Sequence, residues 1–289
     1  VWTMHDIWPA TAVCHITLDC RQFETQCKDC RLLPSGIGRN LARRTWKRKE
    51  AIEGRSHIIY ITCSKWLQGE AKRSALIGQN PIECIPNPID TSVFCKADKA
   101  EARRKLGLPT DKRLILFASQ RVTNQNKGMG YLVDACRKMV EQHPETLANT
   151  AVVVLGGHAE DLRENFDLPM FPLGYVSDTQ RIVDIYNAID VFVLPSLSDN
   201  LPNTIMEAMA CGVPCVGFKV GGIPEMIDHQ RNGYVASLAN SADLATGIHW
   251  ALCEADYSSL SQRAVDKVHS AYSQRTVAMN YIEVYNQAL

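Results

Sequence analysis

Four short apolar runs that alternate with amphipathic segments constrain the fold of this chain more than any other feature. Each run has the length of a strand: RLILFAS (113–119), TAVVVLGG (150–157), DVFVLPS (190–196) and VPCVGF (213–218). Residues 130–140, 178–189 and 204–212 lie between them and carry apolar side chains at helical spacing. Strands that alternate with helices form βαβ units, in which helices cover both faces of a parallel sheet. We therefore expect an α/β, doubly wound, Rossmann-like domain that binds ligands beyond the carboxyl ends of its strands.

The first hundred residues follow a less regular pattern. Residues 57–64 and 82–90 are expected to be strands, and residues 64–73 and 98–108 are expected to be helices. A length of 289 residues suits two domains better than one. We expect a partial first domain over residues 1–100 and the Rossmann-like domain over residues 101–270, with the boundary between Asn87 and Lys112. VWTMHD has the pattern of a strand already begun, so we expect further sequence before Val1.

Composition and charge narrow the class of protein. Hydrophobic residues make up 46% and charged residues 21% of the chain, as in ordinary soluble globular proteins. The net charge of zero argues against a dedicated nucleic-acid binder. No apolar run approaches the roughly 20 residues that span a bilayer. Basic residues exceed acidic ones up to Lys112 and the balance reverses after it, so we expect the basic half to meet an anionic partner.

Two carboxylates lie close together in LPSLSDNLPNTIMEAMAC (194–211), where a strand passes into a helix. We expect Asn200 to be the N-cap of this helix and Pro202 to lie in its first turn. Asp199 then lies just before the helix, and Glu207 lies one to two turns inside it. The N–H groups of a helix N-terminus bind phosphate, and carboxylates beside it can accept hydrogen bonds from sugar hydroxyls. The alternative is that both acids only complement the helix dipole.

Arg121 and Lys127 follow the strand at 113–119 and therefore lie on the same rim of the sheet. Two permanently cationic donors make a suitable clamp for a diphosphate. The alternative is that both are solvated loop charges. Glycines after the other strands would let the backbone approach a ligand, and these are Gly156, Gly157, Gly221 and Gly222.

These motifs, in this order, resemble a known family over nearly the whole chain. PSLSDNLPNTIMEAMACGVPCVG (195–217) resembles the carboxylate-pair signature E-x7-E of family 4 retaining glycosyltransferases of GT-B architecture. FASQRVTNQNKG (117–128) resembles their Arg…Lys-Gly diphosphate site, and NPID, FPLGYVSD, GGIPEMI and NGYVA match further motifs in order. HDIWPATAVCH (5–15) is similar to a motif of a subgroup that acts in bacterial surface-polysaccharide biosynthesis. The resemblance implies two Rossmann-like domains, the first apparently truncated, and a helix over residues 271–289 that crosses back to the first.

The resemblance also implies a role for each candidate residue. Glu207 would hold the ribose of a nucleotide sugar, and Asp199, where the family usually has glutamate, would contact hydroxyls of the donor sugar. Arg121 and Lys127 would neutralise the diphosphate leaving group. His5 would reach the reacting sugar from the first domain, unless it only forms a structural pair with the aspartate that follows it. The remaining donor-binding residues are expected to be Leu201, Pro202, Asn203, Thr204, Gly156 and Gly157.

The implied reaction is the transfer of a sugar, with retention, from a UDP- or GDP-linked donor to a glycan or polyprenyl-linked acceptor. Fixed cations on the phosphate side stabilise the departing diphosphate, so no cofactor and no metal are expected. Two alternatives stay open. One is a GT-B enzyme of another reaction, such as an epimerase or a glucan synthase, and the other is a non-catalytic nucleotide-sugar-binding protein.

Eleven cysteines are a high count for a chain of this length. Several, such as Cys136 and Cys215, stand singly in apolar runs, where a thiol behaves as a small buried hydrophobe. This pattern favours the reducing cytosol. Cys27 and Cys30 have a zinc-like spacing, so a structural metal site, free thiols and a disulfide all stay open for Cys14, Cys20, Cys27 and Cys30.

The segment GRNLARRTWKRKEAI (38–52) is basic and is expected to form a short helix. Basic residues beside an interfacial Trp46 suit docking onto anionic lipid, which would place the protein on the inner face of a membrane. The alternative is an ordinary solvated helix face. The basic residues are Arg39, Arg43, Arg44, Lys47, Arg48 and Lys49.

Overall fold

The computed structural model describes residues 1–34 and 38–289. Its contacts divide the chain into two compact units, one formed by Val1–Asn87 with Val277–Leu289 and the other by Pro88–Thr276. The chain thus changes unit at Asn87 and Pro88, ahead of residue 100, and its C-terminal segment belongs to the first unit. None of the described helices is long and apolar enough to cross a membrane.

The first unit is built on a small parallel sheet. Its strands β1 (Trp2–Met4), β2 (Tyr60–Thr62) and β3 (Ile82–Cys84) pair in the order β1-β2-β3. Helix α11 (Gln274–Ala288) packs Val277 and Val284 against Ile61 and Ile85, which explains why the end of the chain belongs to this unit. The other elements of the unit are α1 (Gly38–Glu53), α2 (Lys65–Lys72) and the 3-10 turns η1 (Trp8–Ala10) and η2 (Gln22–Glu24).

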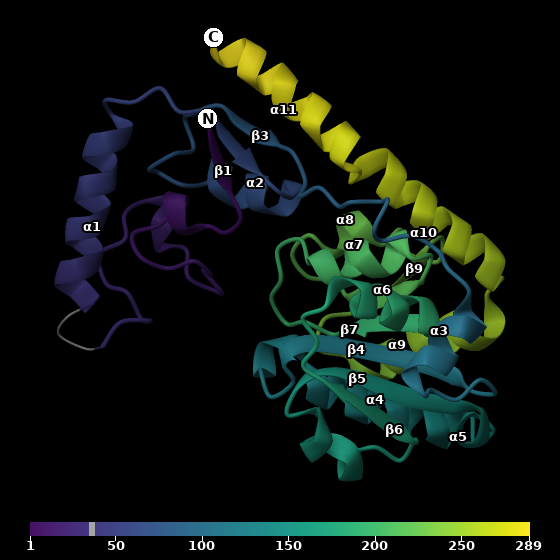
Figure 1. The fold of residues 1–289 in the computed structure, drawn as a ribbon. Helices are drawn as coiled ribbons and strands as arrows, with labels where there is room; N and C mark the ends of the chain where they lie inside the picture. Colours follow the sequence, from purple (N-terminus) through teal and green to yellow (C-terminus); the bar gives the residue numbers. More distant parts are fainter. Residues whose placement is uncertain (35–37) are drawn as a thin grey trace. The chain divides into compact units, whose positions relative to one another are not determined.

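The second unit contains a six-stranded parallel sheet in the order β6-β5-β4-β7-β8-β9 (Figure 1). Every predicted run is present as a strand, and β6 and β9 at the two edges were not predicted as strands. The order reverses between the adjacent strands β4 and β7, which is where doubly wound sheets bind ligands. The strands are β4 (Arg113–Arg121), β5 (Thr150–Gly157), β6 (Met170–Gly174), β7 (Val191–Leu194), β8 (Cys215–Phe218) and β9 (Gly233–Ala236).

Helices cover both faces of this sheet, as its apolar strands require. Ile115 and Phe117 belong to the core cluster that also contains residues of α4 and α9. Leu114 and Leu116 alternate with them, point to the opposite face and are also fully buried. The helical elements are α3 (Lys99–Leu106), η3 (Gln125–Lys127), α4 (Met129–Gln142), α5 (Thr146–Asn149), η4 (Ala159–Asn165), α6 (Thr179–Ala188), α7 (Asn203–Ala210), α8 (Ile223–Met226), α9 (Ser241–His249), the π-helical turn η5 (Trp250–Glu254) and α10 (Tyr257–Ala271).

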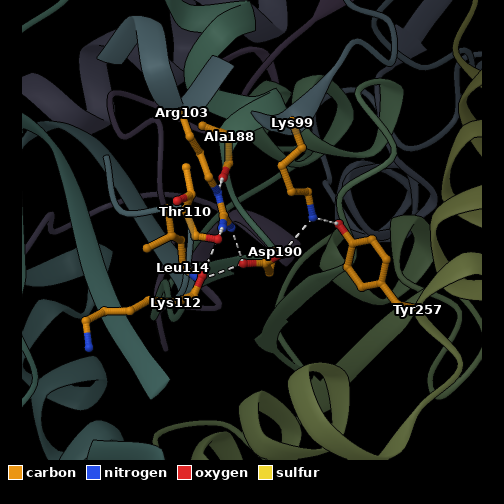
Figure 2. A network of polar contacts seen from close by, with 8 residues as sticks. All are labelled: Lys99, Arg103, Thr110, Lys112, Leu114, Ala188, Asp190 and Tyr257. Carbon is orange, nitrogen blue, oxygen red and sulfur yellow. Dashed lines mark hydrogen bonds and ion pairs between the residues drawn. The ribbon is translucent and has the colours of Figure 1, made fainter. Parts of the chain in front are cut away.

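A buried polar network anchors α3 to the amino ends of β4 and β7 (Figure 2). Arg103 donates to the carbonyl oxygens of Ala188 at 2.7 Å and Lys112 at 2.9 Å, and to Asp190 Oδ2 at 2.6 Å. Asp190 also accepts from Lys99 Nζ at 2.6 Å and from the backbone N–H of Leu114 at 2.7 Å. The carboxylate of Asp190 therefore satisfies charged and backbone donors from three parts of the unit.

Candidate functional site

The loops that follow β4 and β7 are packed together at the point where the strand order reverses. The backbone N–H of Leu197 donates to the carbonyl oxygen of Asn126 at 2.8 Å. Gly128, with φ of 74°, lies so close to this second loop that a Cβ there would be 1.9 Å from the carbonyl oxygen of Pro195. Only glycine fits this contact, so Gly128 lets the two loops pack directly against each other.

Lys127 and Asp199 form a direct ion pair across these two loops. Lys127 Nζ lies 2.6 Å from Asp199 Oδ2, and the two side chains are 30% and 16% exposed. The structure therefore brings together two of the predicted site residues, from positions 72 residues apart. A cation and an acceptor at this edge suit a ligand that carries both phosphate and hydroxyl groups.

Glu207 lies in α7 and accepts a hydrogen bond from the hydroxyl of Tyr186 in α6, at 2.8 Å. Burial raises the pKa of Glu207, and the bond from Tyr186 opposes this shift. Tyr186 was not predicted as a site residue. Its signal was present, because Tyr186 lies on the apolar face of a predicted helix and a buried tyrosine hydroxyl normally needs a partner.

Ionisation of Glu207 is expected to destabilise the second unit as pH rises. Because the folded-state pKa is above the unfolded one, the folded state binds more protons between these two values, and the free energy of unfolding falls with pH there. The contribution is fully present below the unfolded pKa and lost above the folded one. Urea titrations of Glu207→Gln, which keeps an acceptor for Tyr186, should lack this part of the pH dependence. An unchanged pH profile in the variant would contradict the prediction.

Arg121 and the glycines after β5 form the neighbouring part of the rim. Arg121 is the last residue of β4, where it pairs with Gly157, and its side chain is exposed. Gly156, with φ of 145°, packs against β4, and a Cβ there would lie 1.9 Å from the carbonyl oxygen of Ser119. The close approach of β5 to β4 therefore requires glycine at position 156, whether or not a ligand binds there.

The glycine pair after β8 supports the loop that carries Asp199. A Cβ on Gly221 would lie 1.6 Å from the carbonyl oxygen of Asp199, and the N–H of Gly222 donates to the carbonyl oxygen of Asn200 at 2.7 Å. Helix α7 begins at Asn203 with Pro202 as its N-cap. The prediction that Asn200 is the N-cap is therefore wrong, because the loop runs two residues further and its backbone is held by Gly222.

The other predicted donor-binding residues surround the start of α7. Leu201 and Pro202 are buried, Thr204 is half-buried and Asn203 is exposed. The burial of Leu201 and Pro202 gives both side chains a role in packing. A cavity of about 780 Å³ lies beside the loop after β4 and the first turns of α4, and its lining includes neither Lys127 nor Asp199. We place the site at the ion pair rather than in this cavity, because topology and charge both favour the former.

His5 lies in the first unit, directly after β1, and its side chain is exposed. The next residue, Asp6, accepts a hydrogen bond from the backbone N–H of Trp8 at 2.7 Å. Asp6 thus stabilises the turn that follows the strand. The predicted contact between His5 and a donor sugar stays a prediction.

The basic helix differs from the expectation in two ways. Trp46 is only 1% exposed, so the prediction of an interfacial tryptophan is wrong: the helix needs this side chain for packing. Lys49 donates to the carbonyl oxygen of Thr11 at 2.8 Å and lies 3.5 Å from the centre of the Trp8 ring. Burial lowers the pKa of Lys49 to about 8. The exposed cations are Arg43, Arg44, Lys47 and Arg48, and the side chain of Arg39 lies outside the described part of the chain.

The four N-terminal cysteines carry free thiols, so the disulfide alternative is not realised in the structure. Burial raises the pKa of Cys27 to about 11, which disfavours the thiolate. In the described ranges, the ligating side chains that converge on one point lie elsewhere, in the second unit. The zinc alternative at Cys14, Cys20, Cys27 and Cys30 therefore lacks a converged ligand set.

Comparison with known proteins identifies relatives of the second unit. Residues 112–254 match the family described as Glycosyl transferases group 1. The chain is 30% identical over 237 residues to Uncharacterized glycosyltransferase MJ1607 of Methanocaldococcus jannaschii, covering 79% of this chain and 60% of that protein. It is 24% identical over 214 residues to N-acetyl-alpha-D-glucosaminyl L-malate synthase of Bacillus anthracis, covering 72% of this chain and 54% of that protein. The chain thus spans little more than half the length of these curated relatives.

Solved structures show the same fold. The structure of Anabaena HepE in complex with UDP matches with a TM-score of 0.73 at 18% identity, covering 99% of this chain and 71% of that chain. Sucrose-phosphate synthase from Thermosynechococcus elongatus matches with a TM-score of 0.68 at 20% identity, covering 84% of this chain and 61% of that chain. Residues 112–254 therefore form a domain of the glycosyl transferases group 1 family, in a chain of the GT-B fold class.

Proposed function

We propose that this protein is a retaining glycosyltransferase that moves a sugar from a UDP-linked donor to a glycan or lipid-linked acceptor. The ion pair between Lys127 and Asp199 carries this proposal, because it joins the loops after β4 and β7 at the reversal of strand order. The preference for UDP rests on HepE, which was solved with UDP and with UDP-glucose. A GDP-linked donor is the second candidate.

The geometry supports a division of labour within the second unit. Lys127 is released from Asp199 when the donor diphosphate arrives, and it then stabilises the negative charge that develops on the leaving group. Asp199 is left as an acceptor for sugar hydroxyls. Glu207, oriented by Tyr186, accepts hydrogen bonds from the ribose. Arg121, exposed at the end of β4, adds a second cation beside the phosphates.

The first unit is proposed to face the acceptor and to supply His5. The exposed cations of α1, which are Arg43, Arg44, Lys47 and Arg48, suit an anionic acceptor or an anionic lipid surface without a tryptophan anchor. A role in surface-polysaccharide assembly stays a prediction from the motif at residues 5–15, and a place at the inner face of the membrane stays a prediction from the basic helix.

A thermal-shift panel of UDP, GDP and their sugar conjugates tests the donor assignment. At a hundredfold excess over Kd, a bound donor stabilises the second unit by about 2.7 kcal/mol, which corresponds to a rise in Tm of roughly 5–10 °C. We expect UDP and a UDP-sugar to give this rise. Absence of a shift with every uridine and guanosine diphosphate would reject the proposal.

Product analysis on the same samples separates the alternatives. Labelled sugar that appears in an acceptor supports the transferase. A free sugar epimer, or a lengthening glucan, would indicate another GT-B reaction. A donor that binds but is neither hydrolysed nor transferred with any acceptor extract would indicate a non-catalytic nucleotide-sugar-binding protein.

A further inference from the structure

Two histidines and a glutamate lie close together in the second unit, on the side of its sheet where the strands begin. The proposed donor site lies on the other side, where the strands end. His143, Glu145 and His249 each offer one ligand atom, and these atoms all lie within 4.8 Å of one another. His143 and Glu145 lie in the turn between α4 and α5, and His249 ends α9. This turn leads into the amino end of β5, whereas the donor residues follow carboxyl ends of strands.

The backbone of the cluster is firmly held. The N–H of His143 donates to the carbonyl oxygen of Met139 at 2.8 Å, and its carbonyl accepts from the N–H of Thr146 at 2.9 Å. His249 immediately precedes the π-helical turn η5, a rare conformation that often marks functional sites. The ligand atoms are therefore presented by ordered backbone on both sides.

A fourth side chain determines which nitrogen of His249 is available. Glu254 Oε1 lies 2.9 Å from His249 Nδ1. An ionised carboxylate can only accept, so Nδ1 carries the proton and the lone pair is on Nε2. A carboxylate that accepts from the second ring nitrogen is the usual companion of a metal-binding histidine, because it fixes the tautomer and raises the basicity of the ligating nitrogen.

The two imidazole rings are stacked, with centroids 3.6 Å apart and planes at 9°. A metal ion lies in the plane of each ring that binds it, so the ring of His143 must turn out of the stack on binding. Its side chain is 37% exposed and that of Glu145 is 66% exposed, so both have room to turn.

We propose that His143, Glu145 and His249 bind a divalent transition-metal ion, with Zn²⁺ the best match to two imidazoles and one carboxylate. Zinc ligands at 2.0–2.1 Å in tetrahedral geometry lie about 3.3 Å from one another. Since no two of these ligand atoms are more than 4.8 Å apart, each separation closes by at most about 1.5 Å, which rotation of Glu145 and His143 supplies. The bound ion joins the turn between α4 and α5 to the end of α9 and stabilises the second unit, away from the donor site.

A cysteine near the cluster shapes the experiment. Cys253 Sγ accepts from Arg113 Nη1 at 3.2 Å, and its pKa is raised by burial and by the nearby Glu145 and Glu254. Thiols elsewhere in the chain also bind zinc, so affinity alone does not locate the ion. The absorption spectrum of bound Co²⁺ shows whether a thiol is among the ligands, because a thiolate ligand gives an intense charge-transfer absorption that imidazole and carboxylate ligands lack.

The test is a titration of the full chain with Co²⁺ followed by Zn²⁺, read by absorption, calorimetry and Tm. We expect one cobalt ion without thiolate absorption, displaced by Zn²⁺, and a rise in Tm. His143→Ala and the isosteric Glu145→Gln should each lower the affinity at least tenfold, and Glu254→Gln should lower it about 10–100-fold. The matched control is His158→Ala, which removes an exposed histidine that lies 3.4 Å from Asp161 and belongs to no three-ligand group among the described residues.

Two results would overturn the proposal. One is equal cobalt affinity in the wild type, His143→Ala and Glu145→Gln, all shown to be folded by circular dichroism. The other is a thiolate-dominated spectrum, which would place the ion at the N-terminal cysteines if it disappears in Cys27→Ser and at Cys253 if it disappears in Cys253→Ser. Because the cluster and the donor site share no residue, loss of metal binding leaves the test of the proposed function intact.

Discussion

Lys127→Ala is expected to slow sugar transfer by about 10²–10³-fold, the usual cost of removing one fixed donor from a developing negative charge. Lys127 Nζ extends from the loop after β4 and forms an ion pair with Asp199 in the loop after β7. Its charge acts mainly in the transition state, when the diphosphate departs. We therefore expect kcat to fall more than KM rises.

The same substitution should have little effect on folding. The ion pair with Asp199 is 30% and 16% exposed, and pairs near the surface contribute about 0–1 kcal/mol. The matched control is Lys138→Ala in α4, which removes a lysine paired with Asp134 at 3.8 Å on the helix surface. Initial rates of sugar transfer and urea midpoints, measured for both variants, report the effects on catalysis and on folding. Transfer at the wild-type rate by Lys127→Ala would refute the diphosphate assignment.

The central strands of the second sheet were predictable because they are buried on both faces. Continuous apolar runs such as 150–157 are a direct consequence of that burial. The two strands that were not predicted, β6 and β9, lie at the two edges of the sheet. β6 contains Pro172 and ends at Gly174, and β9 begins with Gly233 and leaves Val235 half-buried, so neither has the pattern of a central strand. Pairing with a neighbour, rather than local pattern, makes these segments strands.

The contact between Lys127 and Asp199 was also predictable, since both follow strands that end at the same edge of a parallel sheet. The partner of Glu207 was not, because hydrogen bonding between α6 and α7 depends on how these helices pack. The burial of Trp46 was not predictable either. Leu41 is 43% exposed and Trp46 is 1% exposed, and a strongly basic helix has too few apolar positions to show which face packs.

Asp190→Ala is expected to destabilise the second unit by about 3–5 kcal/mol, the usual cost of removing one partner from a buried ion pair. Arg103, whose side chain is 7% exposed, would keep its bonds to three carbonyl oxygens but lose its counter-charge. The N–H of Leu114 would lose its acceptor at the start of β4. The loss therefore acts on the join between α3, β4 and β7 (Figure 2).

Hydrogen exchange of β4 and β7 peptides, followed by mass spectrometry, measures this loss in the second unit alone. Exchange localises the loss to the strands that Asp190 anchors, which a whole-chain unfolding curve does not do. Asp190→Asn should cost less than Asp190→Ala, because one amide oxygen still accepts from Arg103 or Leu114. The control is Glu101→Ala in the same helix, where the pair with Lys105 is exposed and is worth about 0.3–0.5 kcal/mol. Equal exchange rates in Asp190→Ala and Glu101→Ala would show that the network contributes no more than a surface pair, and that packing of the sheet alone holds α3 in place.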